Sequence, residues 1–323
     1  MCTSITYRKK DHYFGRTLDV DFSFNETVVI TPRNFSFTLH SGNEFQNKYA
    51  LIGMGIVQSD TPMYYEASNE KGLAMAGLNF PKVSPYPSEN PNKVNLTPGE
   101  LIPWILGQAE NLNEARDLLE KANPVSVTFN GMAIAPLHFM LSDASGCIVA
   151  EPSPEGLVIF DNPYDVMTNS PSFDHHLWNM QNYLNLSPKN RENTFSPSYK
   201  MGNYAVGMGA LGLPGDVSST SRFVRAAFNL TNSYSEDEEM ANVTQFFHVL
   251  DSVSMVKGAA ITDQGRYDIT LYTCCINTTK GIYYYKTYDN NQITAIRLDH
   301  ADLDADHLYV YPLRNTQQIF CEN

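Results

Sequence analysis

The sequence is short of basic residues, and this narrows the classes of partner that it can bind. Its 323 residues include 22 Lys and Arg against 35 Asp and Glu, for a formal net charge of -13. Nucleic-acid binding needs clustered cations that neutralise phosphates, so this balance argues against a nucleic-acid partner. It also argues against general attraction of an anionic substrate, which must then be held by local groups and by burial of apolar surface.

Cysteine is also scarce, and no two cysteines have the Cys-x-x-Cys spacing. The five are Cys2, Cys147, Cys274, Cys275 and Cys321. An odd number without that spacing suggests neither a zinc site nor a disulfide framework, and it fits a reducing compartment best. We therefore expect no metal ion, no cofactor and a cytoplasmic location.

Long apolar runs are missing as well. No run approaches the roughly 20 residues that span a bilayer, and the first residues lack the basic and apolar regions of a signal peptide. No Gly-rich strand-to-helix turn of the dinucleotide or phosphate-binding type is present. No low-complexity linker or charge block divides the chain, so residues 1–323 are expected to form one domain without a membrane span.

The apolar pattern predicts strands, then helices, then strands again, which is typical of an α+β architecture with mainly antiparallel sheets. Helices are expected at residues 98–108, 112–122, 218–230 and 240–250. Strands are expected at residues 4–7, 28–31, 35–39, 51–57, 72–78, 137–141, 147–151, 157–160, 270–275 and 282–288.

The most informative position is Cys2, which follows Met1 directly. If Met1 is removed, Cys2 carries both a thiol and a free α-amine. A free thiol titrates at about 8.5 and an α-amine at about 7.7–8.0, so this amine can take the thiol proton near neutral pH. Arg16 is a candidate cation to favour the thiolate, and Asp19 can hydrogen-bond the amine. From these residues alone, Cys2 can equally be an ordinary cysteine and Arg16 a solvated charge.

Five ordered motifs remove that ambiguity. They are Met1-Cys2-Thr3, the segment from Tyr13 to Asp19, Gly77-Leu78-Asn79-Phe80-Pro81, Met167-Thr168-Asn169-Ser170-Pro171, and Gly212 to Ser218 followed by Ser221-Arg222-Phe223. Together they closely resemble the choloylglycine hydrolase family, which comprises bile salt hydrolases and penicillin V acylases. The resemblance runs over essentially the whole chain. It implies an N-terminal-nucleophile hydrolase with an αββα sandwich, in which two stacked antiparallel sheets lie between helix layers.

The resemblance also implies catalytic roles. Cys2 would attack the amide carbonyl, Arg16 and Asp19 would bracket its sulfur and its amine, and Arg222 would hold the charges of the site in register. Judged alone, Arg222 is as well explained as an exposed helical arginine.

Two asparagines would stabilise the oxyanion of the tetrahedral intermediate. Asn169 and Asn79 both match the family pattern, and loss of one such donor typically costs about 10²–10³ in rate. Judged alone, Asn169 is a β-turn asparagine. Members that resemble penicillin V acylases tend to have tyrosine at the position of Asn79, so this chain resembles the bile salt hydrolases.

An apolar wall for a steroid is expected from loops that border the site in the family, although two or three of its members are expected to be plain core residues. These residues are Val20, Phe22, Phe24, Met63, Tyr65, Ala133, Ile134 and Leu137.

The sequence therefore predicts a bacterial bile salt hydrolase that cleaves conjugated bile salts at the amide to glycine or taurine, through a thioester at Cys2. The alternatives are a penicillin V acylase or an acyl-homoserine lactone acylase on the same scaffold, and an inactive ligand-binding homologue. Members of the family are commonly homotetramers, and the polar, irregular segment 188–204 is expected to reach a neighbouring subunit.

Overall fold

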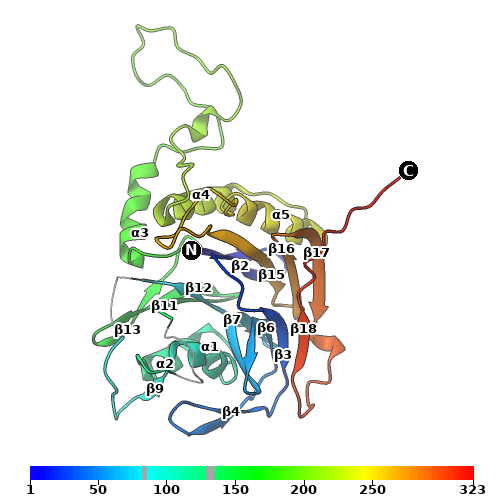
Figure 1. The fold of residues 1–323 in the computed structure, drawn as a ribbon. Coiled ribbons are helices and arrows are strands. Elements are labelled where there is room, and N and C mark those ends of the chain that lie inside the picture. Colours follow the sequence, from blue (N-terminus) through cyan, green and yellow to red (C-terminus); the bar gives the residue numbers. More distant parts are fainter. Residues whose placement is uncertain (82–85, 129–134) are drawn as a thin grey trace.

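Two stacked β-sheets lie between layers of helices in the computed structural model, which describes residues 1–81, 86–128 and 135–323 (Figure 1). The larger sheet contains β3 (Thr27–Thr31), β6 (Leu51–Gln58), β7 (Thr61–Asn69), β8 (Ala74–Asn79), β11 (Leu137–Asp143), β12 (Gly146–Ser153), β13 (Gly156–Asp161) and β18 (Tyr309–Pro312). The smaller sheet contains β1 (Cys2–Arg8), β2 (His12–Val20), β14 (Val166–Met167), β15 (Ile269–Asn277), β16 (Ile282–Thr287) and β17 (Asn290–Arg297).

All pairings within these two sheets are antiparallel, over the part of the chain that the structure describes. The larger sheet has the order β13-β12-β11-β8-β7-β6-β3-β18, and the smaller has the order β14-β1-β2-β15-β16-β17. Two short pairs lie outside them. One joins β4 (Ser36–Thr38) to β5 (Glu44–Gln46), and the other joins β9 (Val94–Leu96) to β10 (Ala122–Pro124).

Helices cover the outer face of each sheet. The larger sheet is covered by α1 (Pro98–Leu106) and α2 (Leu112–Lys121), and the smaller by α4 (Ser219–Asn232) and α5 (Glu239–Asp251). A further helix, α3 (Phe173–Asn179), packs against α4. Short 3₁₀ turns are η1 (Met180–Tyr183), η2 (Met208–Ala210) and η3 (Leu298–His300).

Local sequence explains where the first two helices begin. In α1, Pro98 is the first residue and the Glu100 carboxylate accepts a hydrogen bond from the Thr97 amide at 2.6 Å. In α2, the Asn111 side chain accepts hydrogen bonds from the amides of Asn113 and Glu114. These contacts satisfy amides that an isolated helix end leaves without partners.

Apolar side chains fill two layers. One cluster lies between the sheets and beneath α4 and α5, and the other lies between the larger sheet and the helices α1 and α2. The central strands are therefore buried on both faces, as in β1, where six of seven residues are buried. No helix within residues 1–81, 86–128 and 135–323 has the length and apolar content required to cross a bilayer.

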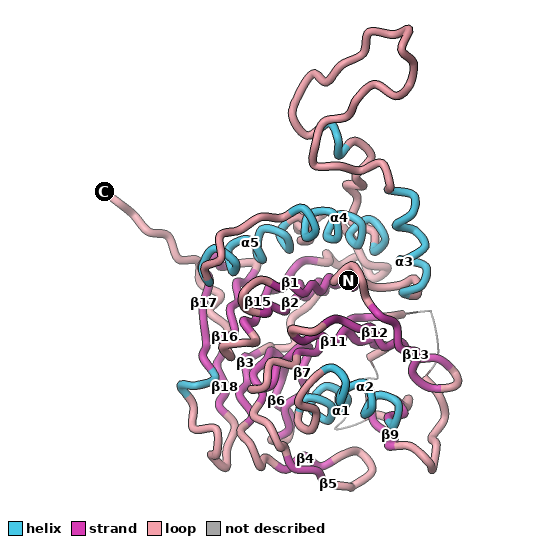
Figure 2. The backbone as a smooth tube through the Cα atoms, turned by 180° about the vertical axis from the view of Figure 1, so that it is seen from behind, coloured by secondary structure: helices cyan, strands magenta, loops and turns pink. Residues whose placement is uncertain are grey.

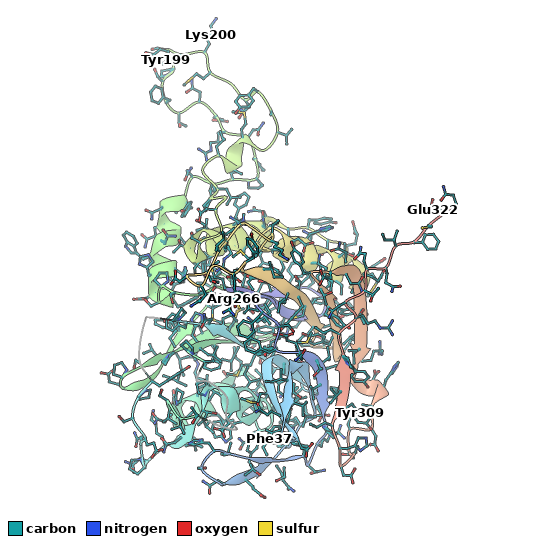
Figure 3. The ribbon with its side chains drawn as sticks, viewed as in Figure 1. Phe37, Tyr199, Lys200, Arg266, Tyr309 and Glu322 are labelled. Carbon is teal, nitrogen blue, oxygen red and sulfur yellow. The ribbon has the colours of Figure 1, made fainter. Side chains whose placement is uncertain are left out.

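The segment between α3 and α4 extends away from the sandwich (Figure 2). Apart from η1 and η2 it has no regular structure, and its far end carries Tyr199 and Lys200 (Figure 3). Several apolar side chains on it are exposed, including Phe195 at 82%, Tyr204 at 83% and Val206 at 97%. The predicted excursion at 188–204 is therefore present.

Candidate active site

The sulfur of Cys2 lies between the two sheets, beside the guanidinium of Arg16. Cys2 begins β1 and pairs with Leu18 of β2, so Arg16, two residues along β2, lies on the same face of the sheet as Cys2. Arg16 Nη2 donates a hydrogen bond to Cys2 Sγ at 2.5 Å, and both residues are buried. A cation at this distance favours the thiolate, the nucleophilic form of cysteine.

Arg16 is fixed where the pairing of β7 with β8 stops. The last pair of that ladder is Glu66 with Ala76. The carbonyls of the next residues on these strands accept from Arg16 Nη1 instead: Gly77 O at 2.7 Å and Tyr65 O at 3.4 Å. Burial acts to lower the pKa of Arg16, but the groups on Cys2, Tyr272 and Glu66 raise it above its usual value, so the guanidinium stays charged.

The backbone of Cys2 is held by Asn169 and Arg222. The Cys2 amide donates to Asn169 Oδ1 at 2.7 Å, and Arg222 Nη2 donates to the same oxygen at 2.7 Å. Arg222 Nη1 donates to Cys2 O at 2.5 Å and to Thr3 Oγ1 at 2.7 Å. Burial lowers the pKa of Arg222, and the charge of Asp19 opposes that shift. Arg222 is fully buried and is not an exposed helical arginine.

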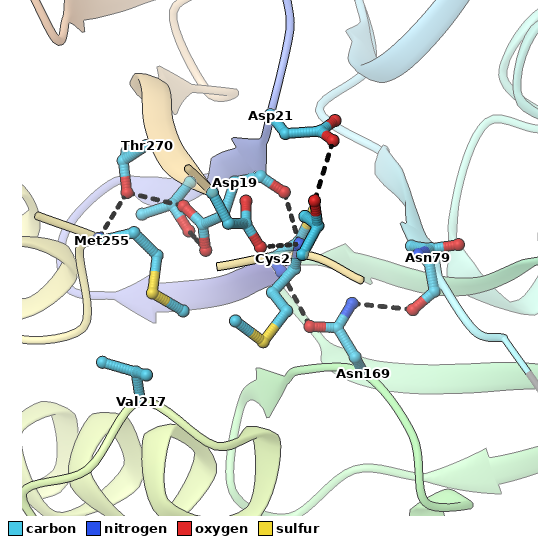
Figure 4. A network of polar contacts seen from close by, with 12 residues as sticks. Cys2, Asp19, Asp21, Asn79, Asn169, Val217, Met255 and Thr270 are labelled. Atoms are coloured by element: carbon cyan, nitrogen blue, oxygen red, sulfur yellow. Dashed lines mark hydrogen bonds and ion pairs between the residues drawn. The ribbon is translucent and has the colours of Figure 1, made fainter. Parts of the chain in front are cut away.

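The first turn of α4 positions both of these side chains. Arg222 belongs to α4, and the Asn169 amide donates to Ser219 Oγ, at the start of the same helix, at 2.9 Å. Asn169 Nδ2 donates to the main-chain oxygen of Asn79 at 2.7 Å. Figure 4 shows Asn169 between Cys2 and Asn79. The side chain of Asn79 is at the exposed end of β8 and lines the cavity described below.

Asp19 is fully buried, and two threonines hold its carboxylate. Thr270 Oγ1 donates to it at 2.6 Å and Thr17 Oγ1 at 3.1 Å. Burial raises the pKa of Asp19, while Arg222 and the terminal amine act to lower it. With Met1 in place, the main-chain oxygen of Asp19, not its carboxylate, accepts a hydrogen bond from the Met1 amine.

Sequence reasoning missed Asp268. Its carboxylate lies 3.2 Å from the Met1 amine, and its other oxygen is buried without a hydrogen-bond partner. Asp268 immediately precedes β15, and neither its neighbours nor its spacing marks it in the sequence. Its position follows only from the pairing of β15 with β2.

A cavity of about 300 Å³ opens onto Cys2, Arg16 and Asn79. Of the side chains predicted to form a steroid wall, Val20, Phe24, Met63, Tyr65 and Leu137 line it. Further lining residues that the sequence did not indicate are Leu18, Ile56, Tyr64, Gly77, Thr97, Pro98, Gly99, Val127 and Ala135.

One predicted wall residue, Phe22, does not line the cavity, and for two others the structure gives no answer. Phe22 is outside the lining; its ring is 45% exposed and packs against Phe24, with centroids 4.4 Å apart. The guanidinium of Arg266 lies over the Phe22 ring at 5.2 Å. Ala133 and Ile134 lie outside the described residues. Predicted contact of Phe22 with a substrate therefore receives no support from the shape of the cavity.

Two buried histidines contact the main chain at Thr168 and Asn169. His176 Nε2 lies 2.9 Å from Asn169 O, and His138 lies 2.9 Å from Thr168 O and 3.0 Å from the Glu151 carboxylate. Burial lowers the pKa of His176 to about 4. Among the residues that the structure describes, no group of three or more His, Cys, Asp or Glu side chains is arranged to hold a metal ion.

Known proteins that are similar to this chain include bile salt hydrolases and a penicillin V acylase. The chain is 45% identical over 324 residues to a bile salt hydrolase/transferase from Lactiplantibacillus plantarum, across 100% of both chains. A crystal structure of a variant conjugated bile acid hydrolase from Clostridium perfringens superposes with a TM-score of 0.92 at 36% identity, covering 100% of both chains. A penicillin V acylase from Agrobacterium tumefaciens shares the fold, with a TM-score of 0.75 at 23% identity over 96% of this chain and 90% of that one.

Residues 2–311 match the family described as linear amide C–N hydrolases, choloylglycine hydrolase family. The sheet order and the helix layers agree with the αββα arrangement expected from the sequence motifs. The chain therefore belongs to the choloylglycine hydrolase family of linear amide C–N hydrolases and has its N-terminal-nucleophile fold.

Proposed function

We propose that this protein hydrolyses the amide that joins a bile acid to glycine or taurine, with Cys2 as the nucleophile. The observation that carries the proposal is the position of Cys2 Sγ, which Arg16 contacts at 2.5 Å where both residues line a largely apolar cavity. Full-length similarity to a bile salt hydrolase/transferase supports the same substrate class.

Activation requires that Cys2 become the first residue. In the structure the Cys2 nitrogen is an amide that donates to Asn169 Oδ1. Removal of the residue before it would leave a free α-amine at this place, on the same residue as the thiol. That amine can take the thiol proton without a histidine, because the two groups titrate near the same pH.

The reaction then has two halves. The thiolate attacks the amide carbonyl carbon, and the protonated amine gives its proton to the nitrogen that leaves as glycine or taurine. The resulting thioester at Cys2 is attacked by water, from which the amine takes a proton. Collapse of the second tetrahedral intermediate releases the bile acid carboxylate and regenerates the thiol.

Asparagine amides would stabilise the oxyanion in both halves. Asn79 faces the cavity beside Cys2. Asn169 Nδ2 has two N–H groups and donates one of them to Asn79 O. Such donors carry no net charge, and they stabilise the negative charge that develops on the carbonyl oxygen. Asp19 and Arg222 would hold the amine and the Cys2 backbone in register.

Apolar lining of the cavity suits the rigid steroid body of a bile salt. Burial of apolar surface contributes about 25 cal/mol per Å², so binding grows with the area of contact. Phe24, Met63 and Leu137 would supply part of this contact. A phenoxyacetyl group is smaller and would cover less of the same wall.

The test is a comparison of kcat/KM for taurocholate, glycocholate and penicillin V. We expect bile amides to be favoured by at least about 1.4–2.8 kcal/mol, which is ten- to a hundredfold. A wild-type preference for penicillin V would reject the bile salt assignment while leaving the nucleophile and fold intact. Binding of taurocholate without turnover would identify an inactive ligand-binding homologue.

We also propose that the protein assembles as a homotetramer, with residues 188–204 reaching a neighbouring subunit. The exposed side chains of Phe195, Tyr199 and Tyr204 on this segment support the proposal. The rings of Phe195 and Tyr199 lie side by side, with centroids 6.2 Å apart, and exposed patches of apolar side chains mark contact surfaces. Sedimentation at assay concentration should give an oligomer; a stable, fully active monomer would reject it. Five free cysteines support a reducing, cytoplasmic location, which cell fractionation would test.

A further inference from the structure

Glu66 is a fully buried carboxylate of β7 that the proposed mechanism does not use. It belongs to the larger sheet, yet its partners come from the smaller one. Tyr272 Oη donates to it at 2.8 Å, Tyr283 Oη at 2.5 Å and Cys274 Sγ at 3.4 Å. Its Oε2 also lies 3.7 Å from Arg16 Nε. A buried carboxylate is costly without such partners, so this site is built to keep one between the sheets.

Arg16 connects this carboxylate to the sulfur of Cys2. The guanidinium Nε donates to Thr17 O at 3.2 Å and lies 3.7 Å from Glu66 Oε2, while Nη2 donates to Cys2 Sγ. Because a guanidinium is a rigid planar fork, an ion pair that orients one edge also orients the other. The same pair places a negative charge close to the cation that favours the thiolate.

We propose that Glu66 is a positioning residue for Cys2 that acts through Arg16. Together with the carbonyls of Thr17 and Gly77, it holds Arg16 with Nη2 toward Cys2 Sγ, and its negative charge limits how strongly Arg16 favours the thiolate. The inference rests on the proposed role of Cys2 as the nucleophile. It adds a carboxylate of the larger sheet to a site whose nucleophile and cation both belong to the smaller sheet.

Protonation of Glu66 removes that charge near neutral pH. Burial raises the pKa of Glu66 to about 7, while Arg16 and the hydrogen bonds that it accepts act to lower it. The titratable groups that face it are Arg16 on β2, Tyr272 and Cys274 on β15, Tyr283 on β16 and its neighbour Tyr65 on β7. As pH rises, ionised Glu66 would offset Arg16. The reactivity of Cys2 would therefore rise with pH over a wider range than the titration of one isolated group produces.

The experiment follows alkylation of Cys2 by iodoacetamide against pH, read from the mass of its peptide. Glutamine keeps an oxygen beside Arg16 but lacks the offsetting charge, so for Glu66→Gln we expect a curve steeper than that of the wild type, with its midpoint at least about half a pH unit lower. Glu70→Gln is the matched control. Glu70 follows β7 and pairs with Arg33 at 2.5 Å, so its removal breaks a similar ion pair that does not contact Arg16. Its curve should match that of the wild type.

A wild-type alkylation curve in Glu66→Gln, with only a lower melting temperature, would show a purely structural role and overturn the proposal. If Glu66→Gln does not fold, Tyr272→Phe and Tyr283→Phe each remove one donor and keep the carboxylate. Both should move the Glu66-dependent part of the curve to higher pH, and unchanged curves in both would also overturn it. Alkylation does not involve substrate, so a failure to cleave bile amides would reject the proposed function separately.

Discussion

Arg222 fixes the orientation of the Asn169 side chain: its Nη2 donates to Asn169 Oδ1 at 2.7 Å, and the Cys2 amide donates to the same oxygen. With Oδ1 occupied by two donors, Nδ2 must point the other way, toward Asn79. The direction of a donor beside the nucleophile is thus set by a residue of α4, far away in the sequence.

Replacement of this arginine should reduce catalysis strongly. A lysine at position 222 cannot contact Cys2 O, Thr3 Oγ1 and Asn169 Oδ1 at once, so we expect Arg222→Lys to lower kcat by about 10²-fold or more. Steady-state kinetics on taurocholate measures this. Arg225→Lys is the control, since Arg225 lies on the same helix but contacts main-chain oxygens away from Cys2. Equal losses in both variants would contradict the role given to Arg222.

Substitution of Asn79 tests the oxyanion proposal without disturbing the fold. Its main-chain oxygen makes the contact with Asn169, and its side chain is at an exposed strand end. We therefore expect Asn79→Ala to lower kcat by about 10²–10³ with little change in melting temperature. A kcat within tenfold of the wild type would remove Asn79 from the oxyanion site.

Phe24 and Phe22 provide a test variant and a matched control for the apolar wall of the cavity. Their rings touch, but Phe24 lines the cavity and Phe22 does not. Phe24→Ala should raise KM for taurocholate by roughly tenfold, because a buried aromatic contact is worth about 1.5–3 kcal/mol. KM for penicillin V should rise less, and Phe22→Ala should change either KM little. The opposite order, with Phe22 the more important, would mean that the bound steroid lies outside this cavity.

The buried side chain of His12 should make the stability of the fold sensitive to acid. It lies between the sheets, bonded to Thr6, Thr278 and Ser142, and burial lowers its pKa from 6.5 to about 4. Its contribution to stability is therefore complete above pH 6.5 and is lost as pH falls toward 4, because the unfolded chain binds the proton first. The loss is on the order of 3 kcal/mol.

The measurement is the free energy of unfolding between pH 7 and pH 4.5 for the wild type and for His12→Gln. The variant lacks this titration, so its stability should fall less over the interval. Buried carboxylates such as Asp19 and Glu66 titrate in both proteins and cancel in the difference. An identical pH dependence would show that His12 does not couple folding to protons.

Much of the layered fold could be predicted from the sequence, because central strands such as 51–57 and 137–141 are apolar and bounded by turn residues. The strands β2 and β7 were missed as strands. β2 carries His12, Arg16 and Asp19 into the interior, so its polar residues hide the apolar pattern typical of a buried strand. The strand β17 was missed because it is half exposed and carries polar residues.

The catalytic candidates came from motifs, whereas their supporting residues could not be predicted. Cys2, Arg16 and Asn169 lie in short recognisable segments and meet in the structure as expected. Glu66 contacts Arg16 from the opposite sheet and Asp268 contacts the Met1 amine, at sequence separations that no local pattern encodes. A buried carboxylate looks the same in sequence as a solvated one, and only the pairing of strands and the stacking of the two sheets distinguish them.

The central claim is that Cys2, once it is the first residue, carries the bile acyl group as a thioester. The most direct measurement is the mass of the Cys2 peptide from active protein quenched with acid during taurocholate turnover. We expect a peptide that begins at Cys2 and carries one cholyl group, absent from Cys2→Ser, whose activity should be lower by several orders of magnitude. Active protein that retains Met1, or a Cys2→Ser variant with more than about a tenth of the wild-type rate, would contradict the account.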